Sequence, residues 1–170
     1  MQKNFSHPVS VDDIFGAQKE YKLTANALQR REIAEIFKVP EVKEFAADIY
    51  AERKKKSTII DVWGYVHALI TRQSVISLEY FDKEYDSEFV LQFDTNITEA
   101  QIREMEENGE DSIPDSVQNG IIDMAHLAME QIALELEDHP RQDGEVFSFS
   151  SEFTSTEHEN PFKILEKLKK

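Results

Sequence analysis

Apolar and polar residues alternate through three stretches of the chain, and this pattern predicts β-strands. The stretches run from Phe45 to Glu52, from Thr58 to Thr71 and from Glu84 to Phe93. The middle one is apolar on both faces, so we expect a central strand there. Gly64 inside it indicates a bulge or the close approach of another backbone. Short connections between the stretches favour an antiparallel meander.

Two other stretches have the helical period. Leu28, Ile33, Ile36 and Phe37 predict a short helix over residues 25–37, which Pro40 stops. A second helix should begin at the N-cap Asp123 and run to about residue 136. Its expected buried face consists of Met124, Leu127, Ala128, Ile132, Leu134 and Leu136. Before the first helix, residues 5–15 should be extended, with Phe5, Val9 and Val11 available for burial.

These elements predict an α+β fold, either an antiparallel sheet or a partly closed barrel with packed helices. We expect one domain over residues 1–147, with a mobile acidic loop at about 94–120 that opens with a helical turn at 98–105. Residues 148–159 are rich in Ser, Thr and Glu, which predicts a flexible linker. Residues 160–170 predict a short C-terminal amphipathic helix.

That terminal segment carries its own start signal. Asn160 suits the N-cap, Pro161 suits the first helical position, and Phe162, Leu165 and Leu168 share one face. A helix of about three turns is marginal alone in water, so it should dock on its own domain or on a partner.

Composition limits the class of protein and the cell compartment that we expect. With 170 residues, 40% hydrophobic residues and eleven Phe, the chain can bury a core. No apolar run approaches the length of about 20 residues that spans a membrane, and the N-terminus has no secretory pattern. We therefore expect a cytoplasmic protein without a membrane partner. The absence of cysteine excludes disulfides, thiol catalysis and cysteine-bound zinc.

Charge is distributed unevenly along the chain. The net charge is −15, and residues 94–160 carry eighteen acids against Arg103 and Arg141. Such a surface can serve solubility or can attract a basic partner by electrostatic steering, whereas it disfavours direct contact with RNA. The candidate partner-binding residues are the acidic Glu104, Glu106, Glu107, Glu110 and Asp111 and the apolar Phe162, Leu165 and Leu168.

Signatures of catalysis are missing from the sequence. No glycine-rich phosphate loop, G-x-S-x-G turn or H-E-x-x-H pair occurs, and the five histidines are far apart. We predict no enzyme activity, no cofactor and no metal. An enzyme with an unrecognised site remains an alternative, which a deep pocket holding a buried carboxylate or histidine would favour.

An RNA-binding module is the other alternative. It would use Arg30 and Arg31 together with the cluster Arg53, Lys54, Lys55 and Lys56, which should form a turn. This hypothesis requires both clusters to meet on one face of the fold.

Three stretches resemble the YceD family of bacterial proteins, which are linked to accumulation of large-subunit ribosomal RNA. Residues 74–81, S-V-I-S-L-E-Y-F, lie after Gly64 where the family has a C-x-R-C-L-E-P-type turn. Residues 122–123, 130–136 and 140–141 resemble the family's helix and its exit. Residues 160–169 resemble its closing N-P-F-x-x-L-x-x-L-K pattern. With serines in the turn in place of cysteines, the chain resembles the alphaproteobacterial members of the family.

The resemblance implies a non-catalytic role in ribosome assembly, with a basic large-subunit ribosomal protein or a pre-ribosomal particle as the partner. The acidic stretch would suit such a cationic protein. Ser74 and Ser77 stand at the family's cysteine positions, so the turn must be held by hydrogen bonds and packing instead of a metal. Tyr80 in place of the family's proline leaves the local geometry of the turn open.

Overall fold

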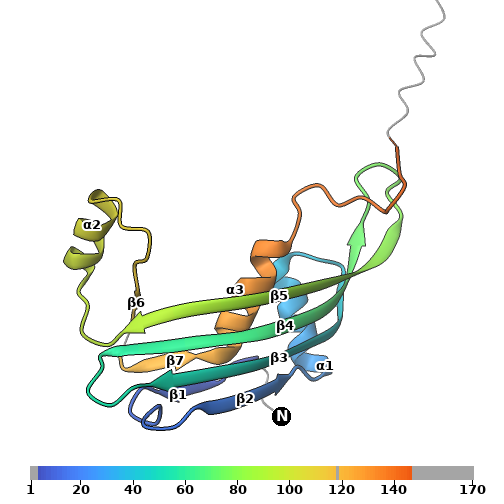
Figure 1. Ribbon diagram of the computed structural model, residues 1–170. Helices are drawn as coiled ribbons and strands as arrows, with labels where there is room; N and C mark the ends of the chain where they lie inside the picture. Colours follow the sequence, from blue (N-terminus) through green and yellow to red (C-terminus); the bar gives the residue numbers. More distant parts are fainter. Residues whose placement is uncertain (1–3, 118, 147–170) are drawn as a thin grey trace, which may run out of the picture.

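The computed structural model describes residues 4–117 and 119–146 (Figure 1). Five strands form one sheet in the order β2-β3-β4-β5-β6, and β1 pairs separately with β7. The large strands are β2 Lys19–Thr24, β3 Glu41–Arg53, β4 Ile59–Gln73 and β5 Tyr80–Asp94. The short ones are β1 Pro8–Ser10, β6 Asp115–Ser116 and β7 Ile121–Asp123. The predicted α+β class is confirmed, and the sheet is open, not barrel-like.

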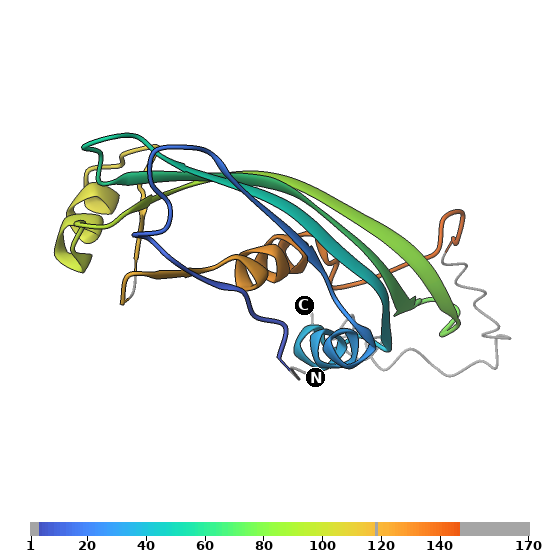
Figure 2. The ribbon, with the colours of Figure 1, turned by 90° about the horizontal axis from the view of Figure 1, so that it is seen from below.

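The sheet arches over two of the three helices, α1 Ala27–Phe37 and α3 Met124–Glu135, as Figure 2 shows. Strands β3 to β5 form the predicted antiparallel meander, β2 pairs antiparallel with β3, and β6 adds two residues in parallel to the end of β5. Their inward side chains form the core with the helices, and the largest fully buried ones on the sheet are Phe45, Ile49, Ile60 and Ile70. Burial of this apolar surface is the main force that holds the helices against the sheet.

Strand β4 is central, as predicted, and Gly64 marks the close approach of another backbone. A Cβ atom at this position would lie 2.5 Å from the carbonyl oxygen of Asp48 on β3. Only glycine fits there without movement of β3. The opposite face of β4 is apolar but is not covered, because Tyr65 is exposed and Trp63 is only half-buried.

Helix α1 forms where the spacing of apolar residues predicts it, and a capping box stabilises its start. The Asn26 side chain accepts hydrogen bonds from the backbone N–H groups of Leu28 and Gln29, and the Gln29 side chain accepts one from the Asn26 backbone. Ile33 and Ala34 are buried against β3, whereas Ile36 is 55% exposed. The predicted apolar face is therefore only partly covered.

Helix α3 begins at Asp123, as predicted. The Asp123 carboxylate accepts hydrogen bonds from the N–H groups of Ala125 and His126, and it also holds the N-terminal strand through Ser6 and the His7 N–H group. Met124, Leu127, Ala128 and Ile132 of the predicted face are buried, and Leu136, directly after the helix, is partly buried. Leu134 is 79% exposed, because it lies on the solvent side of the helix.

One strand differs from the sequence interpretation. Strand β2 was not predicted, because only Tyr21 and Leu23 are apolar in it, and its pairing with β3 stabilises it instead.

The acidic loop opens with a helical segment, as predicted for residues 98–105. Helix α2 spans Glu99–Glu107, with a capping box between Thr98 and Gln101. None of its residues is buried. The predicted linker 148–159 and terminal helix 160–170 lie outside the described residues.

Candidate functional site

The outward face of the large sheet is open to solvent. Side chains alternate along each strand, so residues that pair across β3, β4 and β5 share a face. Helices α1 and α3 lie on the inward, concave side (Figure 2). Within residues 4–117 and 119–146, no helix packs on the outward side, which we call the open face.

Aromatic side chains occupy the middle of the open face. Tyr50 on β3 stacks on Trp63 on β4, with ring centroids 5.9 Å apart and an angle of 21° between the rings. Trp63 pairs with Val90 of β5, which is 76% exposed, and Tyr65 is 42% exposed. These four side chains form an apolar and aromatic centre that water can reach.

Carboxylates surround this centre. Eleven acids occupy outward positions by strand register: Glu20, Glu41, Glu44, Asp48, Glu52, Asp61, Asp82, Glu84, Asp86, Glu88 and Asp94. The only lysines on this face of the described strands are Lys22 and Lys43. The open face is therefore strongly negative.

Hydrogen bonds fix two of the carboxylates in their ionised form. Asp86 accepts a hydrogen bond from the Tyr65 hydroxyl and lies 2.8 Å from Nδ1 of His67, and these bonds lower the pKa of Asp86. The Lys43 ammonium, 2.5 Å away, and the Thr71 hydroxyl, 2.7 Å away, lower the pKa of Asp82 in the same manner. Both groups stay anionic at neutral pH.

This arrangement suits cations better than proton transfer. Aromatic faces attract ammonium and guanidinium groups, and carboxylates around them add charge attraction. His67 with Asp86 resembles part of a catalytic pair, but both lie on a surface in contact with water. Across the described ranges, no group of three or more His, Cys, Asp or Glu side chains could hold a metal ion.

The acidic residues singled out from the sequence lie elsewhere. Glu104, Glu106 and Glu107 are exposed on α2, and Glu110 and Asp111 follow in the loop. Helix α2 lies beyond the end of β5, toward the side that carries α3 (Figure 2). These residues form a second acidic surface, separate from the open face. Phe162, Leu165 and Leu168 lie outside the described residues.

The two basic clusters do not meet. Arg30 and Arg31 lie on α1, beside the start of β3, whereas the cluster from Arg53 to Lys56 forms the turn after the end of β3 (Figure 1). Thirteen residues of extended strand separate the two places, which is about 40 Å. One phosphate-binding patch cannot include both clusters.

The turn that contains Ser74 and Ser77 is held by a carboxylate. Ser74 Oγ and Ser77 Oγ each donate to Glu145, at 2.5 Å in both cases. Ser74 Oγ also accepts from the N–H groups of Ile76 and Ser77. The hydrogen bonds that Glu145 accepts lower its pKa, so the ionised carboxylate bridges the two serine side chains. The expectation that hydrogen bonds hold this turn is confirmed.

Sequence reasoning missed the open face as a site. Its signal was present in the alternation, since the pattern from Phe45 to Glu52 puts Asp48, Tyr50 and Glu52 on the polar side of the strand. The charge count was made along the chain, however, and the strand region then looks nearly neutral. Apart from Lys22 and Lys43, the lysines and arginines of the described strand region lie in turns, on α1 or on the inward side.

Comparison with protein-family models found no match, and comparisons with curated proteins and with solved structures found none either. The resemblance to the YceD family therefore stays a prediction. Among the described helices, none combines the length and the apolar character that crossing a membrane requires.

Proposed function

We propose that this protein is a non-catalytic binding factor that captures a basic large-subunit ribosomal protein, free or in a pre-ribosomal particle, in the cytoplasm. It would thereby support accumulation of large-subunit ribosomal RNA. The proposed capture rests on the open face, and the ribosomal setting rests on the resemblance of residues 64–169 to the YceD family.

The observation that carries the proposal is the combination of eleven carboxylates with an exposed aromatic centre on one face. Carboxylates attract a cationic protein from a distance and raise its rate of encounter. At contact, lysine and arginine side chains can lie on Trp63 and Tyr65, while their alkyl parts pack against Val90. A basic ribosomal protein shielded in this manner would be kept from nonspecific contact with RNA.

The second acidic surface supports the same function. Helix α2 and the following loop place Glu104, Glu106, Glu107, Glu110 and Asp111 in solvent at one end of the molecule. Exposed charges of this kind act through steering more than through affinity at contact. In the proposed mechanism they attract the partner, and the open face binds it.

A role without catalysis agrees with the character of the polar groups. The pKa values of Asp82 and Asp86 on the open face are lowered, whereas an acid or base that works near neutral pH needs a pKa close to 7. The groove between α1 and α3 has an apolar floor. An RNA-binding module is disfavoured because its two basic clusters are about 40 Å apart and the open face repels phosphate.

Affinity capture from growing bacterial cells tests this proposal. The tagged protein is bound at low salt, washed with rising salt and analysed for protein and RNA. We expect one basic large-subunit protein to be enriched and then released by salt, because screening weakens charge attraction. Recovery of RNA that persists after ribosomal proteins are stripped would contradict the proposal and support the RNA-binding alternative.

A further inference from the structure

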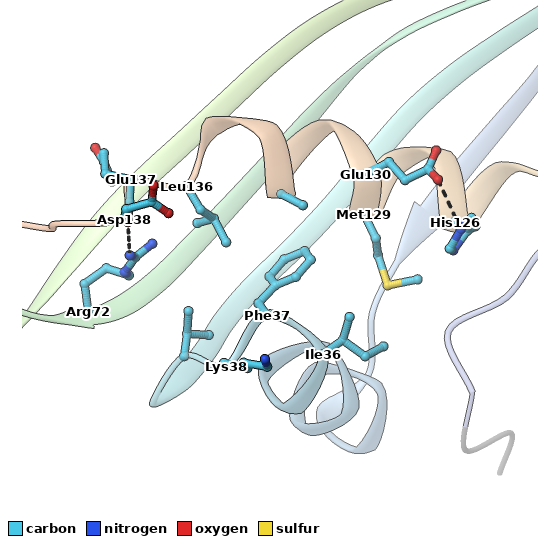
Figure 3. Close-up of a pocket in the computed structure, with 12 residues that line it drawn as sticks. Ile36, Phe37, Lys38, Arg72, His126, Met129, Glu130, Leu136, Glu137 and Asp138 are labelled. Atoms are coloured by element: carbon cyan, nitrogen blue, oxygen red, sulfur yellow. Dashed lines mark hydrogen bonds and ion pairs between the residues drawn. The ribbon is translucent and has the colours of Figure 1, made fainter.

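A groove runs between the end of α1 and the second half of α3, with a volume of about 630 Å³ (Figure 3). It lies on the concave side of the sheet, away from the open face. Its apolar lining comes from both helices and from the residues just after them, and consists of Ile36, Phe37, Val39, Met129, Ala133 and Leu136. Such a volume and lining are typical of sites that accept apolar side chains.

The apolar side chains of this groove lack a complete cover. Ile36 is 55% exposed although it belongs to the apolar face of α1, and Ala133 is exposed on α3. Figure 3 shows Ile36 and Phe37 directed toward Met129 and Leu136 from opposite walls. Contiguous exposed apolar surface between two helices usually marks a place where another segment packs.

Charged and polar residues form the rim of the groove. Glu130, Glu137 and Asp138 lie around the apolar floor with the permanent cations Lys38 and Arg72 and with His126. His126 lies 3.2 Å from Glu130, and Glu137 also pairs with Lys83. Arg72 is already engaged, since its Nη2 atom donates to the carbonyl oxygen of Glu137 at 2.6 Å. An occupant with apolar residues on one side and lysines beside them fits this rim.

We infer that the groove binds residues 160–170 of the same chain, with Phe162, Leu165 and Leu168 against its apolar floor. These three residues share one face if the segment is helical, and the segment carries four lysines against one acid, Glu166. The lysines would lie beside the carboxylates of the rim. This inference does not depend on the proposed function of the open face.

The connection is long enough for this docking. The described chain ends at Val146, directly after Glu145, whose carboxylate accepts from Ser74. Ser74 is two residues from Arg72 at the rim, so the chain leaves the described domain near one end of the groove. The thirteen residues 147–159 can extend over about 45 Å.

Tethering also favours the chain's own segment over another occupant. A segment joined by a short connection has an effective concentration of about 1 mM at a nearby site, well above that of a second copy in dilute solution. A helix of about three turns is marginal by itself, and burial of three large apolar side chains would supply the missing stability.

Paramagnetic broadening in the intact, ¹⁵N-labelled protein tests the inference. The chain has no cysteine, so Ile36→Cys and Ala133→Cys each give a single attachment site for a nitroxide on one wall of the groove. Val90→Cys gives a control label on the open face. We expect both groove labels, and not the control label, to broaden the amide signals of residues 160–168.

Two variants and a mixed sample complete the test. Replacing Phe162, Leu165 and Leu168 with Ala should restore the signals, whereas the matched change Lys163→Gln on the polar side should leave most of the broadening. An unchanged spectrum of the sheet residues confirms that each variant folds. The inference is overturned if the groove labels have no effect or act no more strongly than the Val90→Cys label. It is also overturned if a mixture of nitroxide-labelled ¹⁴N protein with nitroxide-free ¹⁵N protein shows the same broadening, because a second copy then fills the groove.

Discussion

Tyr50 and Trp63 stack on the outward face of neighbouring strands, with their ring centroids 5.9 Å apart. Neither ring is covered by a helix in the described part of the chain, and carboxylates surround both. An aromatic pair of this size commonly lies in a core, so its place on an acidic surface requires another reason. The proposed binding of a cationic partner would explain why this pair lies on the surface.

Trp63 should report the binding of that partner directly, because it is the only tryptophan of the chain. A lysine-rich or arginine-rich peptide that binds the open face should change the Trp63 fluorescence in a manner that salt reverses. Tyr65→Ala should weaken this binding by about 0.5–1 kcal/mol, the usual size of a cation–π contact at an exposed site. Fluorescence titration measures both effects, and a Tyr65→Phe variant, which keeps the ring, should bind nearly as the parent does.

Ser74→Ala should loosen the turn between β4 and β5. The Ser74 side chain is fully buried, accepts from two backbone N–H groups and donates to Glu145, so its removal should cost about 1–3 kcal/mol of the free energy of unfolding. Ser77→Ala is the matched control, because Ser77 is exposed, and it should cost less. Urea unfolding of both variants checks this difference, and equal losses would contradict the role assigned to Ser74.

Glu145 should make the same turn sensitive to acid. Hydrogen bonds from the two serines lower the pKa of Glu145 below its unfolded value, so this contribution is complete above the ordinary glutamate range. It is lost as the pH falls through the lowered folded pKa. Hydrogen exchange of residues 74–79 should therefore accelerate in acid in the parent protein. In Glu145→Gln the exchange should already be faster at neutral pH and should change less with pH.

Asp123 should contribute both to α3 and to the docking of the N-terminal strand. Asp123→Ala removes an N-cap and two further bonds, to Ser6 and the His7 N–H group, and should cost about 1–2 kcal/mol of unfolding free energy. Burial alone would raise the pKa of Asp123, but its hydrogen bonds outweigh this and lower it. The difference between parent and variant should therefore be largest near neutral pH and shrink in acid, whereas Asp12→Ala, at an exposed residue, should show neither effect.

Much of the fold follows from local pattern. Alternation located β3, β4 and β5, the helical spacing of apolar residues located α1, and the capping residue Asp123 located the start of α3. Gly64 indicated the close approach to Asp48, because a Cβ atom at position 64 would clash with the Asp48 carbonyl oxygen. The strand β2 escaped prediction because Tyr21 and Leu23 are its only apolar residues, and its stability comes from pairing with β3.

The candidate site was harder to predict, because it depends on which residues share a face. Asp48, Asp86 and Glu20 are far apart in sequence and come together only through the register of four strands. Counting charge along the chain pointed to residues 94–160, where α2 does carry exposed acids. Counting by face, which needs the pairing of strands, identifies the larger acidic surface.

The most direct test compares neutralised forms of the two acidic surfaces. One variant carries Asp48→Asn, Glu84→Gln and Glu88→Gln on the open face, and the other carries Glu104→Gln, Glu106→Gln and Glu107→Gln on α2. Each loses three exposed charges, so their net charges match. Retention of basic large-subunit ribosomal proteins by the immobilised variants is measured at several salt concentrations. The account predicts that the open-face variant loses most of its retention, while the α2 variant binds more slowly but keeps most of it. Equal losses, or loss only in the α2 variant, would contradict the claim that the open face is the binding surface.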